Sequence, residues 1–401
     1  MNKNTKICII GLGYIGLPTS ALLASRNYKV YGVDTTKDIV DTINRGEIHI
    51  VEPELDVFVR SAVNSGNLKA DTKPTEADVF IIAVPTPFHE GYVPNIDYVV
   101  SATKAIAPYV KEGNIVILES TSPVGTTHKI EEVLKEEGVD TSKIYIAHCP
   151  ERVLPGHIMR ELVENDRIVG GITPEATEAT VAFYETFVHG AVLKTDAKTA
   201  EMAKLTENSY RDVNIAFANE LSILCDKFGI NEWELIELAN RHPRVNILQP
   251  GVGVGGHCIA VDPWFIVHAG GEDAKIIRTA REVNTYKTEW AIEKIKNAAL
   301  KFENENGTKA KVACMGLAFK PDIDDLRESP ALYVTRRLKA DGLHTLVVEP
   351  NIKSHPEFEI ISDAEAIEEA DIVVYLVSHK QFKGIRIFGK TVLDFCGIMN
   401  K

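Results

Sequence analysis

The sequence has few of the features that would place a protein in a membrane, on a nucleic acid or around a zinc ion. No apolar run reaches the roughly 18 residues that a membrane-spanning helix requires. Lys and Arg total 44 against 57 Asp and Glu, and a net charge of −13 argues against a general nucleic-acid or anionic-membrane surface. The six cysteines form no C-x-x-C pair, so we expect no metal site. Scattered thiols favour a reducing, cytoplasmic location.

What the chain does contain is typical of a soluble multidomain protein. It has 401 residues, of which 45% are apolar and 25% charged, and at roughly 100–200 residues per domain we expect two to four domains. Strand and helix patterns alternate over residues 1–190, become helical over 191–303, and alternate again over 304–401. We therefore predict an α/β fold in which two Rossmann-like, doubly wound parallel-sheet domains are joined by a central helical domain.

The N-terminal segment KICIIGLGYIGLPTSALLASRNYKVYGVD predicts a dinucleotide-binding turn between a strand and a helix. In G-x-G-x-x-G, Gly11 makes the turn, Gly13 admits a pyrophosphate, and Gly16 lets the helix pack on the strand. The helix N-terminus then faces the phosphates. Asp34 ends the second strand, where a carboxylate accepts from ribose hydroxyls and repels a 2′-phosphate. We therefore expect NAD rather than NADP.

Apolar runs between residues 78 and 153 predict three further strands of the same sheet. The carboxyl ends of parallel strands meet at one edge, and ligands bind there. Three polar residues fall just beyond these strand ends: Thr86, Thr121 and Glu151.

Helical periodicity predicts one long helix over residues 197–228 and another over 273–303. At about 100° per residue, Lys204, Asn208 and Arg211 share one face of the first helix. A polar stripe of this kind is usually a solvated face, but Lys, Asn and Arg together can also hold an oxyanion and a diphosphate.

The C-terminal third repeats the plan of the N-terminal domain without its glycine pattern. ADIVVYLVSHKQFK (370–383) echoes ADVFIIAVPTPFHE (77–90), and the first turn reads GLAFK. We therefore expect this domain to bind a nucleotide other than a second dinucleotide. Lys320 and Arg327 follow its first strand, where they can reach a uridine or its phosphates.

The stretch GVGGHCIAVD (253–262) presents Cys258 between a glycine run and Asp262, either as a buried thiol after a turn or as a nucleophile. A thiolate beside a nicotinamide adds to an aldehyde, giving a thiohemiacetal and then a thioester that water cleaves to a carboxylate. A nearby lysine would stabilise the thiolate and the oxyanion, and Asp262 would orient that lysine or a water. Arg241, His242 and Arg244 precede this stretch, as an exposed basic turn or as a phosphate clamp.

Seven segments, in order along nearly the whole chain, resemble the UDP-glucose/GDP-mannose dehydrogenase family. They are GLGYIGLP, VPTP, ESTSPVGTT, CPERVLPG, AEMAKLTENSYRDVNIAFANEL, GVGGHCIAVDPWF and GLAFKPDIDDLRESPA. The resemblance implies an NAD-dependent, four-electron oxidation at C6 of a nucleotide-linked sugar. It also implies a homodimer or larger homo-oligomer built on the central helices, with Arg244 reaching the neighbouring site.

The resemblance assigns residue roles by motif. It implies Cys258 as nucleophile and Lys204 as catalytic lysine, with helpers that position water and protons: Asn208, Thr121, Glu151 and Asp262. Beside the three glycines, the implied cofactor contacts are Tyr14, Ile15, Asp34, Thr86 and Thr127. The implied nucleotide-sugar contacts are Arg152, Val153, Lys204, Asn208, Arg211, His242, Arg244, Gly255, Lys320 and Arg327.

Two departures from the UDP-glucose and GDP-mannose branches point to 2-acetamido sugars: Val261 stands where they have lysine, and His257 where they have Ser or Thr. IAVDPWF resembles the mannosamine enzymes more than the glucosamine ones. The implied reaction is oxidation of UDP-N-acetyl-D-mannosamine to its uronate for surface polysaccharides, with UDP-N-acetylglucosamine or another UDP-hexose as the alternative substrate.

Two other readings stay open at this point. A β-hydroxyacid-type dehydrogenase performs one two-electron step, and it also pairs a Rossmann domain with Lys and Asn one helical turn apart, but it needs no cysteine and no third domain. A nucleotide-sugar sensor that keeps the fold and lacks the chemistry would have lost Cys258 or Lys204, and both are present.

Overall fold

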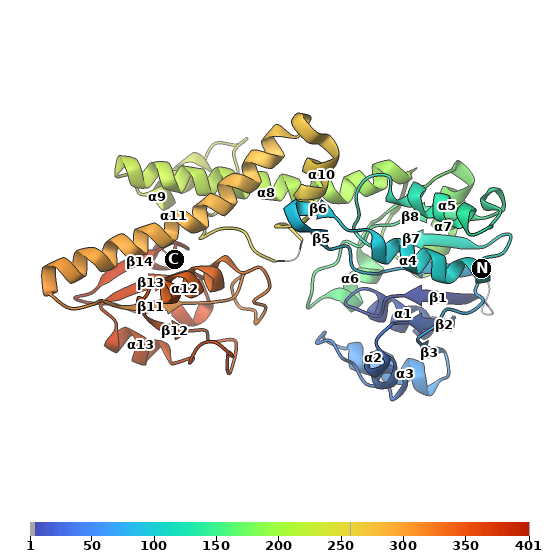
Figure 1. Cartoon of the computed structure of the whole chain (residues 1–401), viewed down its shortest axis with the longest axis horizontal. Helices are drawn as coiled ribbons and strands as arrows, with labels where there is room; N and C mark the ends of the chain where they lie inside the picture. The colour runs from blue at the N-terminus through green and yellow to red at the C-terminus, as the bar shows by residue number, and fades with distance from the viewer. Residues whose placement is uncertain (1–4, 257, 401) are drawn as a thin grey trace. The chain divides into compact units, whose positions relative to one another are not determined.

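The computed structural model describes residues 5–256 and 258–400 of the chain. It consists of two compact units, Met1–Thr206 and Glu207–Lys401. Helix α8 (Ala197–Phe228) begins in the first unit and ends in the second, over the span that its periodicity predicts (Figure 1). The three-domain division expected from the sequence stays a prediction.

An eight-stranded sheet forms the centre of the first unit, in the order β10-β9-β8-β7-β4-β1-β2-β3. All neighbouring strands are parallel except β8 and β9, which pair antiparallel with Ala147 opposite Gly171. The predicted doubly wound parallel sheet is therefore confirmed, with one antiparallel pair. The strands are β1 (Lys6–Ile10), β2 (Lys29–Val33), β3 (Leu68–Asp71), β4 (Val79–Ile82), β7 (Ile115–Leu118), β8 (Tyr145–His148), β9 (Arg167–Gly171) and β10 (Val192–Asp196).

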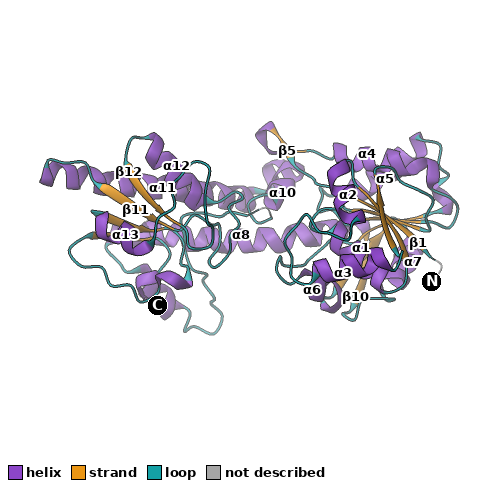
Figure 2. Ribbon diagram, turned by 90° about the horizontal axis from the view of Figure 1, so that it is seen from below, coloured by secondary structure: helices purple, strands orange, loops and turns teal. Residues whose placement is uncertain are grey.

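Helices cover both faces of this sheet (Figure 2). Because side chains alternate along a strand, Ile7 and Ile9 pack with α1 and α3, whereas Cys8 and Ile10 pack with α4 and α5. Burial on both faces explains why β4 reads as an unbroken apolar run. The helices are α1 (Gly16–Ser25), α2 (Lys37–Asn44), α3 (Leu55–Asn64), α4 (Asp97–Ile106), α5 (Thr126–Glu136), α6 (Ile158–Glu164) and α7 (Pro174–Tyr184), and a short hairpin of β5 (Phe88–His89) and β6 (Val93–Pro94) precedes α4.

The helical part of the second unit contains the rest of α8 and three more helices. They are α9 (Glu232–Ala239), α10 (Asp262–Gly270) and α11 (Lys275–Asn306). Buried polar pairs join α8 to α11: Arg281 donates to the Asp212 carboxylate at 2.6 Å, and Asn219 donates to Asn284 at 2.8 Å. These pairs fix the register of two long helices.

The C-terminal sheet has the order β12-β11-β13-β14, with every pair parallel. Val312 and Cys314 pack against α11 and α12 on one face, and Ala313 and Met315 pack toward α13 on the other. The predicted second Rossmann-like domain is confirmed (Figure 1). Its elements are β11 (Lys311–Met315), α12 (Pro330–Ala340), β12 (His344–Val348), α13 (Asp363–Glu369), β13 (Ile372–Tyr375) and β14 (Thr391–Asp394).

Candidate active site and nucleotide-binding regions

The glycine turn after β1 has the geometry that its sequence predicts. Gly11 has φ +93°, and a Cβ there would lie 2.5 Å from the carbonyl oxygen of Ala83. A Cβ on Gly16 would lie 1.8 Å from the carbonyl oxygen of Gly11, so helix α1 can approach the strand only because residue 16 is glycine. An added Cβ on Gly13 would meet no described atom within 4 Å. Gly13 thus faces open space at the N-terminus of α1, as pyrophosphate binding requires.

Asp34 lies beside this turn and is half-buried. Its carboxylate accepts from the backbone N–H of Leu12 at 3.2 Å and from that of Thr36 at 2.9 Å. Tyr14, which is 41% exposed, and Ile15 stand at the start of α1. An open glycine, a helix N-terminus and a carboxylate at the end of β2 are the groups that a dinucleotide needs, so the residues present fit NAD.

The carboxyl ends of β4 and β7 are tied together by predicted site residues. The Thr86 hydroxyl donates to the carbonyl oxygen of Thr121 at 2.5 Å. The two threonines therefore lie side by side at the edge of the sheet where ligands bind.

Thr127 is fully buried and bound to a residue that the sequence analysis missed. Its N–H and hydroxyl donate to Glu201 Oε1 at 2.7 and 2.6 Å, and the N–H of Gly125 donates to Oε2 at 2.6 Å. The Glu201 carboxylate therefore caps the N-terminus of α5. Glu201 lies three residues before Lys204 on the polar face of α8, and this spacing was the available signal. The assignment of Thr127 as a cofactor contact stays a prediction.

Glu151 sits in a buried cluster of charges. It accepts from Arg167 Nη1 at 2.7 Å and from the backbone N–H of Arg152 at 2.6 Å. Glu119 accepts from the Tyr184 hydroxyl at 2.6 Å and interacts electrostatically with both Arg167 and Glu151. Burial raises the pKa of Glu119 to about 7, although the positive charge of Arg167 opposes the rise. Arg167 begins β9 and Glu119 directly follows β7, and the sequence singled out neither residue.

Cys258 is exposed on the loop before α10, so of the two alternatives left open by the sequence the buried thiol is excluded. Its carbonyl oxygen accepts from the N–H groups of Val261 and Asp262 at 3.1 and 2.8 Å. The buried Asp262 carboxylate accepts from Asn208 Nδ2 at 2.6 Å. The structure thus brings together three predicted catalytic residues of the second unit, while the approach of Lys204 stays a prediction. His257 lies outside the described residues.

The glycines before Cys258 let another loop of the same unit approach. A Cβ on Gly255 would lie 2.5 Å from the carbonyl oxygen of Glu328, and one on Gly256 would lie 2.8 Å from the Phe319 ring. The N–H of Gly256 donates to the carbonyl oxygen of Arg327 at 3.3 Å. The cysteine loop therefore packs on the loop that joins β11 to α12, which the sequence analysis did not foresee. The role of Gly255 toward the nucleotide sugar stays a prediction.

The basic residues predicted to hold the nucleotide sugar are mostly exposed. The Arg327 guanidinium donates to both carboxylate oxygens of Asp325 at 2.6–3.0 Å, and Arg152 Nη1 donates to the carbonyl oxygen of Asp166 at 3.2 Å. A phosphate that binds Arg327 would have to displace the Asp325 carboxylate from its guanidinium. The exposed members are Arg211, His242, Arg244, Lys320 and Arg327, and the half-buried ones are Arg152 and Lys204. Val153, an apolar residue of the same predicted set, is also half-buried.

The turn after β11 repeats the backbone of the turn after β1. The N–H of Gly11 donates to Val33 O at 2.8 Å, and the N–H of Gly316 donates to Val348 O at the same distance. Gly316 has φ +99°, and a Cβ there would lie 2.6 Å from Val377 Cβ. The two domains thus share a nucleotide-fold turn although only the first has the three-glycine pattern.

Three successive segments of the chain match the domains of one protein family. Models of the UDP-glucose/GDP-mannose dehydrogenase family match residues 5–188 (NAD binding domain), 198–286 (central domain) and 313–401 (UDP binding domain). The chain belongs to the UDP-glucose/GDP-mannose dehydrogenase family. It is therefore an NAD-dependent nucleotide-sugar dehydrogenase, and the single-step alternative and the sensor reading are set aside.

Relatives within this family are similar to the chain over nearly its whole length. A UDP-N-acetyl-D-mannosamine dehydrogenase of Campylobacter jejuni is 58% identical over 99% of this chain and 100% of that protein. An NDP-N-acetyl-D-galactosaminuronic acid dehydrogenase of Ralstonia nicotianae is 54% identical over 98% and 96%. The solved structure of a UDP-D-ManNAc dehydrogenase from Pyrococcus horikoshii superposes with a TM-score of 0.88 at 38% identity, over 98% of this chain and 96% of that one.

No described helix is both long and apolar enough to cross a bilayer.

Proposed function

We propose that the enzyme oxidises UDP-N-acetyl-D-mannosamine at C6 to the uronate, a precursor of surface polysaccharide. The observation that carries this proposal is the exposed Cys258, one turn from the Asn208–Asp262 contact, in a chain with NAD-binding and UDP-binding domains. The relatives named for the same sugar support the choice of substrate. The 54% identity to a galactosaminuronic acid enzyme keeps another UDP-hexosamine as the second candidate.

The reaction needs two oxidations and one hydrolysis. NAD, when bound at the Gly11–Gly16 turn, accepts a hydride in each oxidation. The Cys258 thiolate attacks the C6 aldehyde of the first oxidation and forms a C–S bond, so that the second oxidation leaves a thioester. Water then adds to the thioester carbonyl, the C–S bond breaks, and the carboxylate and thiol are released. Four electrons leave the sugar, and water supplies the second oxygen.

Neighbouring side chains orient these steps. Asn208 Nδ2 donates to Asp262 Oδ2, and this contact holds the Asp262 side chain in place beside the cysteine loop. We assign Lys204 to the negative charge that develops at the sulfur and at C6 oxygen. We assign the hydrolytic water to Glu151 and Thr121, and the Arg167 contact fixes the orientation of the Glu151 carboxylate.

The test counts NADH against uronate with purified enzyme and a panel of UDP-ManNAc, UDP-GlcNAc, UDP-GalNAc, UDP-glucose and GDP-mannose. We expect a ratio of two and the highest kcat/KM for UDP-ManNAc. The Cys258→Ser variant should lose uronate formation, whereas Cys225→Ser, at a buried position of α8, should keep the ratio of two. A wild-type ratio of one with released aldehyde would contradict the thioester route, and preference for another sugar would reassign the substrate.

We also propose that the enzyme forms a homodimer through α8 and works in the cytoplasm. Large apolar side chains on α8 are exposed at seven-residue spacing, with Tyr210 70%, Phe217 57% and Leu224 40% accessible. Residues seven apart lie on the same face of a helix, so these three form one apolar stripe suited to a second copy of α8. Buried thiols such as Cys8 and Cys314 fit a reducing compartment.

A further inference from the structure

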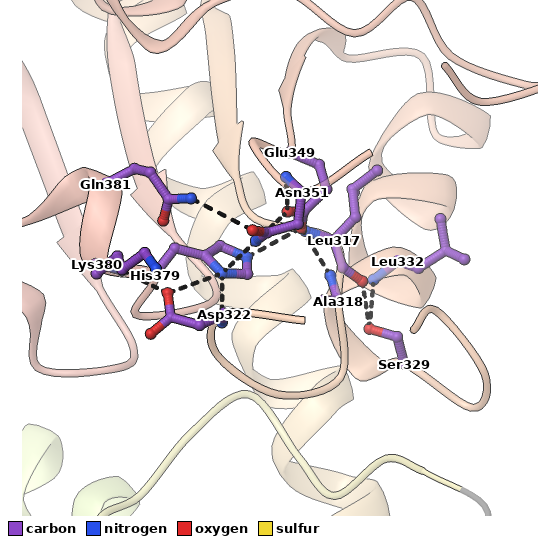
Figure 3. A network of polar contacts seen from close by, with 10 residues as sticks. All are labelled: Leu317, Ala318, Asp322, Ser329, Leu332, Glu349, Asn351, His379, Lys380 and Gln381. Carbon is purple, nitrogen blue, oxygen red and sulfur yellow. Dashed lines mark hydrogen bonds and ion pairs between the residues drawn. The ribbon is translucent and has the colours of Figure 1, made fainter. Parts of the chain in front are cut away.

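Two buried ionisable side chains meet in the C-terminal sheet domain, outside the residues assigned to the chemistry (Figure 3). Glu349 directly follows β12 and is 1% exposed, and His379 lies beyond β13 and is fully buried. His379 Nε2 lies 3.0 Å from Glu349 Oε2. A buried pair of this kind is costly unless each polar atom has a partner, so its contacts show what it holds.

The contacts determine which nitrogen of His379 carries the proton. The backbone N–H of Asp322 donates to His379 Nδ1 at 2.9 Å. A backbone amide nitrogen is only a donor, so Nδ1 must accept, and Nε2 carries the hydrogen and donates to Glu349. Burial favours a higher pKa for Glu349, but the hydrogen bonds from His379 and Leu317 outweigh it and hold the pKa below its usual range. The pair is thus a neutral imidazole on a carboxylate.

Glu349 occupies the position that Asp34 has in the first domain, at the end of the second strand beside the glycine turn. Two backbone contacts also match, because each carboxylate accepts from the residue after the turn glycine and from the residue two positions after itself. The other contacts differ. Asp34 is half-buried and open to a ribose, whereas Glu349 Oε2 accepts from the N–H groups of Leu317 and Ala318 at 2.7 and 3.0 Å as well as from His379. Asn351 donates to the other oxygen through its backbone and side chain, both at 3.0 Å. Both oxygens of the Glu349 carboxylate therefore accept hydrogen bonds from within the domain.

What the pair anchors is the loop over residues 316–329 between β11 and α12. Asp322 and Glu328 have φ +62° and +50°, and such non-glycine conformations persist only where surrounding contacts impose them. At Asp322 the contacts are His379 on its N–H and the Lys380 N–H on its carboxylate, at 2.8 Å. At the other end, the Ser329 hydroxyl donates to Leu317 O at 2.6 Å.

We propose that Glu349 and His379 are positioning residues for the UDP moiety, because they fix the 316–329 loop that presents Lys320. The inference rests on the proposed function and on the sequence-based prediction that Lys320 contacts the UDP sugar. His379 holds the segment around Lys320, while Ser329 separately holds the end of the loop that packs on Gly255 and Gly256. Loss of His379 therefore weakens UDP binding with little effect on the cysteine loop.

The experiment measures UDP and NAD affinities by calorimetry for the full-length wild type, His379→Ala and His379→Asn. We expect His379→Ala to weaken UDP binding at least tenfold and leave NAD binding within twofold. His379→Asn keeps an acceptor near the place of Nδ1 and should restore part of the affinity. In turnover, KM for the UDP sugar should rise while kcat changes less than twofold. The control is His355→Ala, because His355 Nδ1 also accepts a backbone N–H in this domain, from Glu357 at 3.1 Å.

The outcomes separate this inference from the function on which it rests. A wild type that binds no UDP contradicts the proposed function itself. A wild type that binds UDP, with His379→Ala binding it equally well, overturns the positioning role, and so does a parallel loss of NAD affinity. If His379→Ala does not fold, Glu349→Gln replaces it under the same criteria, because it weakens the acceptor shared by His379 and the loop N–H groups.

Discussion

Lys287 illustrates at the scale of one residue how burial changes chemistry. It lies on α11, is 2% exposed, and donates to the Ser222 hydroxyl at 2.6 Å. Its ammonium lies 3.8 Å from the centroid of the Trp290 ring. Burial lowers the pKa of Lys287 to about 7, although the negative charges of Glu232 and Asp226 oppose the shift. The sequence shows only a lysine within a helix.

Lys287→Met should stabilise the protein at neutral pH and change its pH dependence. Because the pKa of Lys287 falls from 10.5 to about 7 on folding, the unfolded chain binds more protons between these values, and stability rises with pH there. Below pH 7 Lys287 is charged in the folded and the unfolded protein, and the cost of burying its charge lowers stability by the full amount. At pH 7 the free energy of unfolding of the variant should exceed that of the wild type by on the order of 1–3 kcal/mol, a gain that the lost contact with Trp290 reduces. The rise of stability with pH should disappear in the variant. Urea unfolding from pH 6 to 10 measures both.

The control for Lys287→Met is Lys301→Met, on the exposed face of the same helix, where we expect no change in slope. Parallel stability curves for wild type and Lys287→Met would show that the buried amine remains protonated.

At the scale of elements, the least expected contact is that of α8 with α5. Three donors at the start of α5 converge on Glu201, which is 1% exposed. Helix N-termini carry unpaired N–H groups and partial positive charge, so a carboxylate there satisfies both. Burial raises the pKa of Glu201 while these hydrogen bonds oppose the rise.

Glu201→Ala should therefore cost on the order of 1–3 kcal/mol, since it leaves buried donors without an acceptor. Chemical denaturation measures the loss, and Glu220→Ala, at an exposed position of the same helix, should stay close to wild type. Equal stabilities of the two variants would mean that water can replace Glu201 as the acceptor for the N–H groups at the start of α5.

At this scale the sequence predicted several elements correctly, because the order of apolar and polar residues carries the strand and helix periods. Helix α8 matches its expected span, Ala197–Phe228. The antiparallel pairing of β8 with β9 was not predicted, because strand direction depends on how the chain returns through α6 and not on the strand's own residues. The turn at Gly316 was predicted from GLAFK, but its contacts with Val348 and Val377 were not, because these residues are distant in sequence.

At the scale of the whole molecule, the proposed dimer gives the clearest prediction. Phe217 is 57% exposed in the middle of the α8 stripe, and a charge there would be buried without a partner in the dimer. Phe217→Glu should therefore shift the molar mass from twice the 44.3 kDa of the chain to a single chain, as measured by light scattering after gel filtration. Phe388→Glu, at a position 79% exposed in the C-terminal domain, should remain dimeric. A wild type that is monomeric would contradict the proposed dimer.

The sequence by itself determined the fold class, the choice of NAD and the family, because glycine spacing, strand-end acids and ordered motifs are local patterns. It also singled out Cys258, Asn208 and Asp262. Only the tertiary structure decided which of these residues meet, since the Asn208–Asp262 contact joins positions 54 apart in the chain. It also showed that Glu349 is buried and accepts from His379 and from the N–H groups of Leu317 and Ala318. A side chain's partners depend on packing, and local sequence does not encode packing between distant segments.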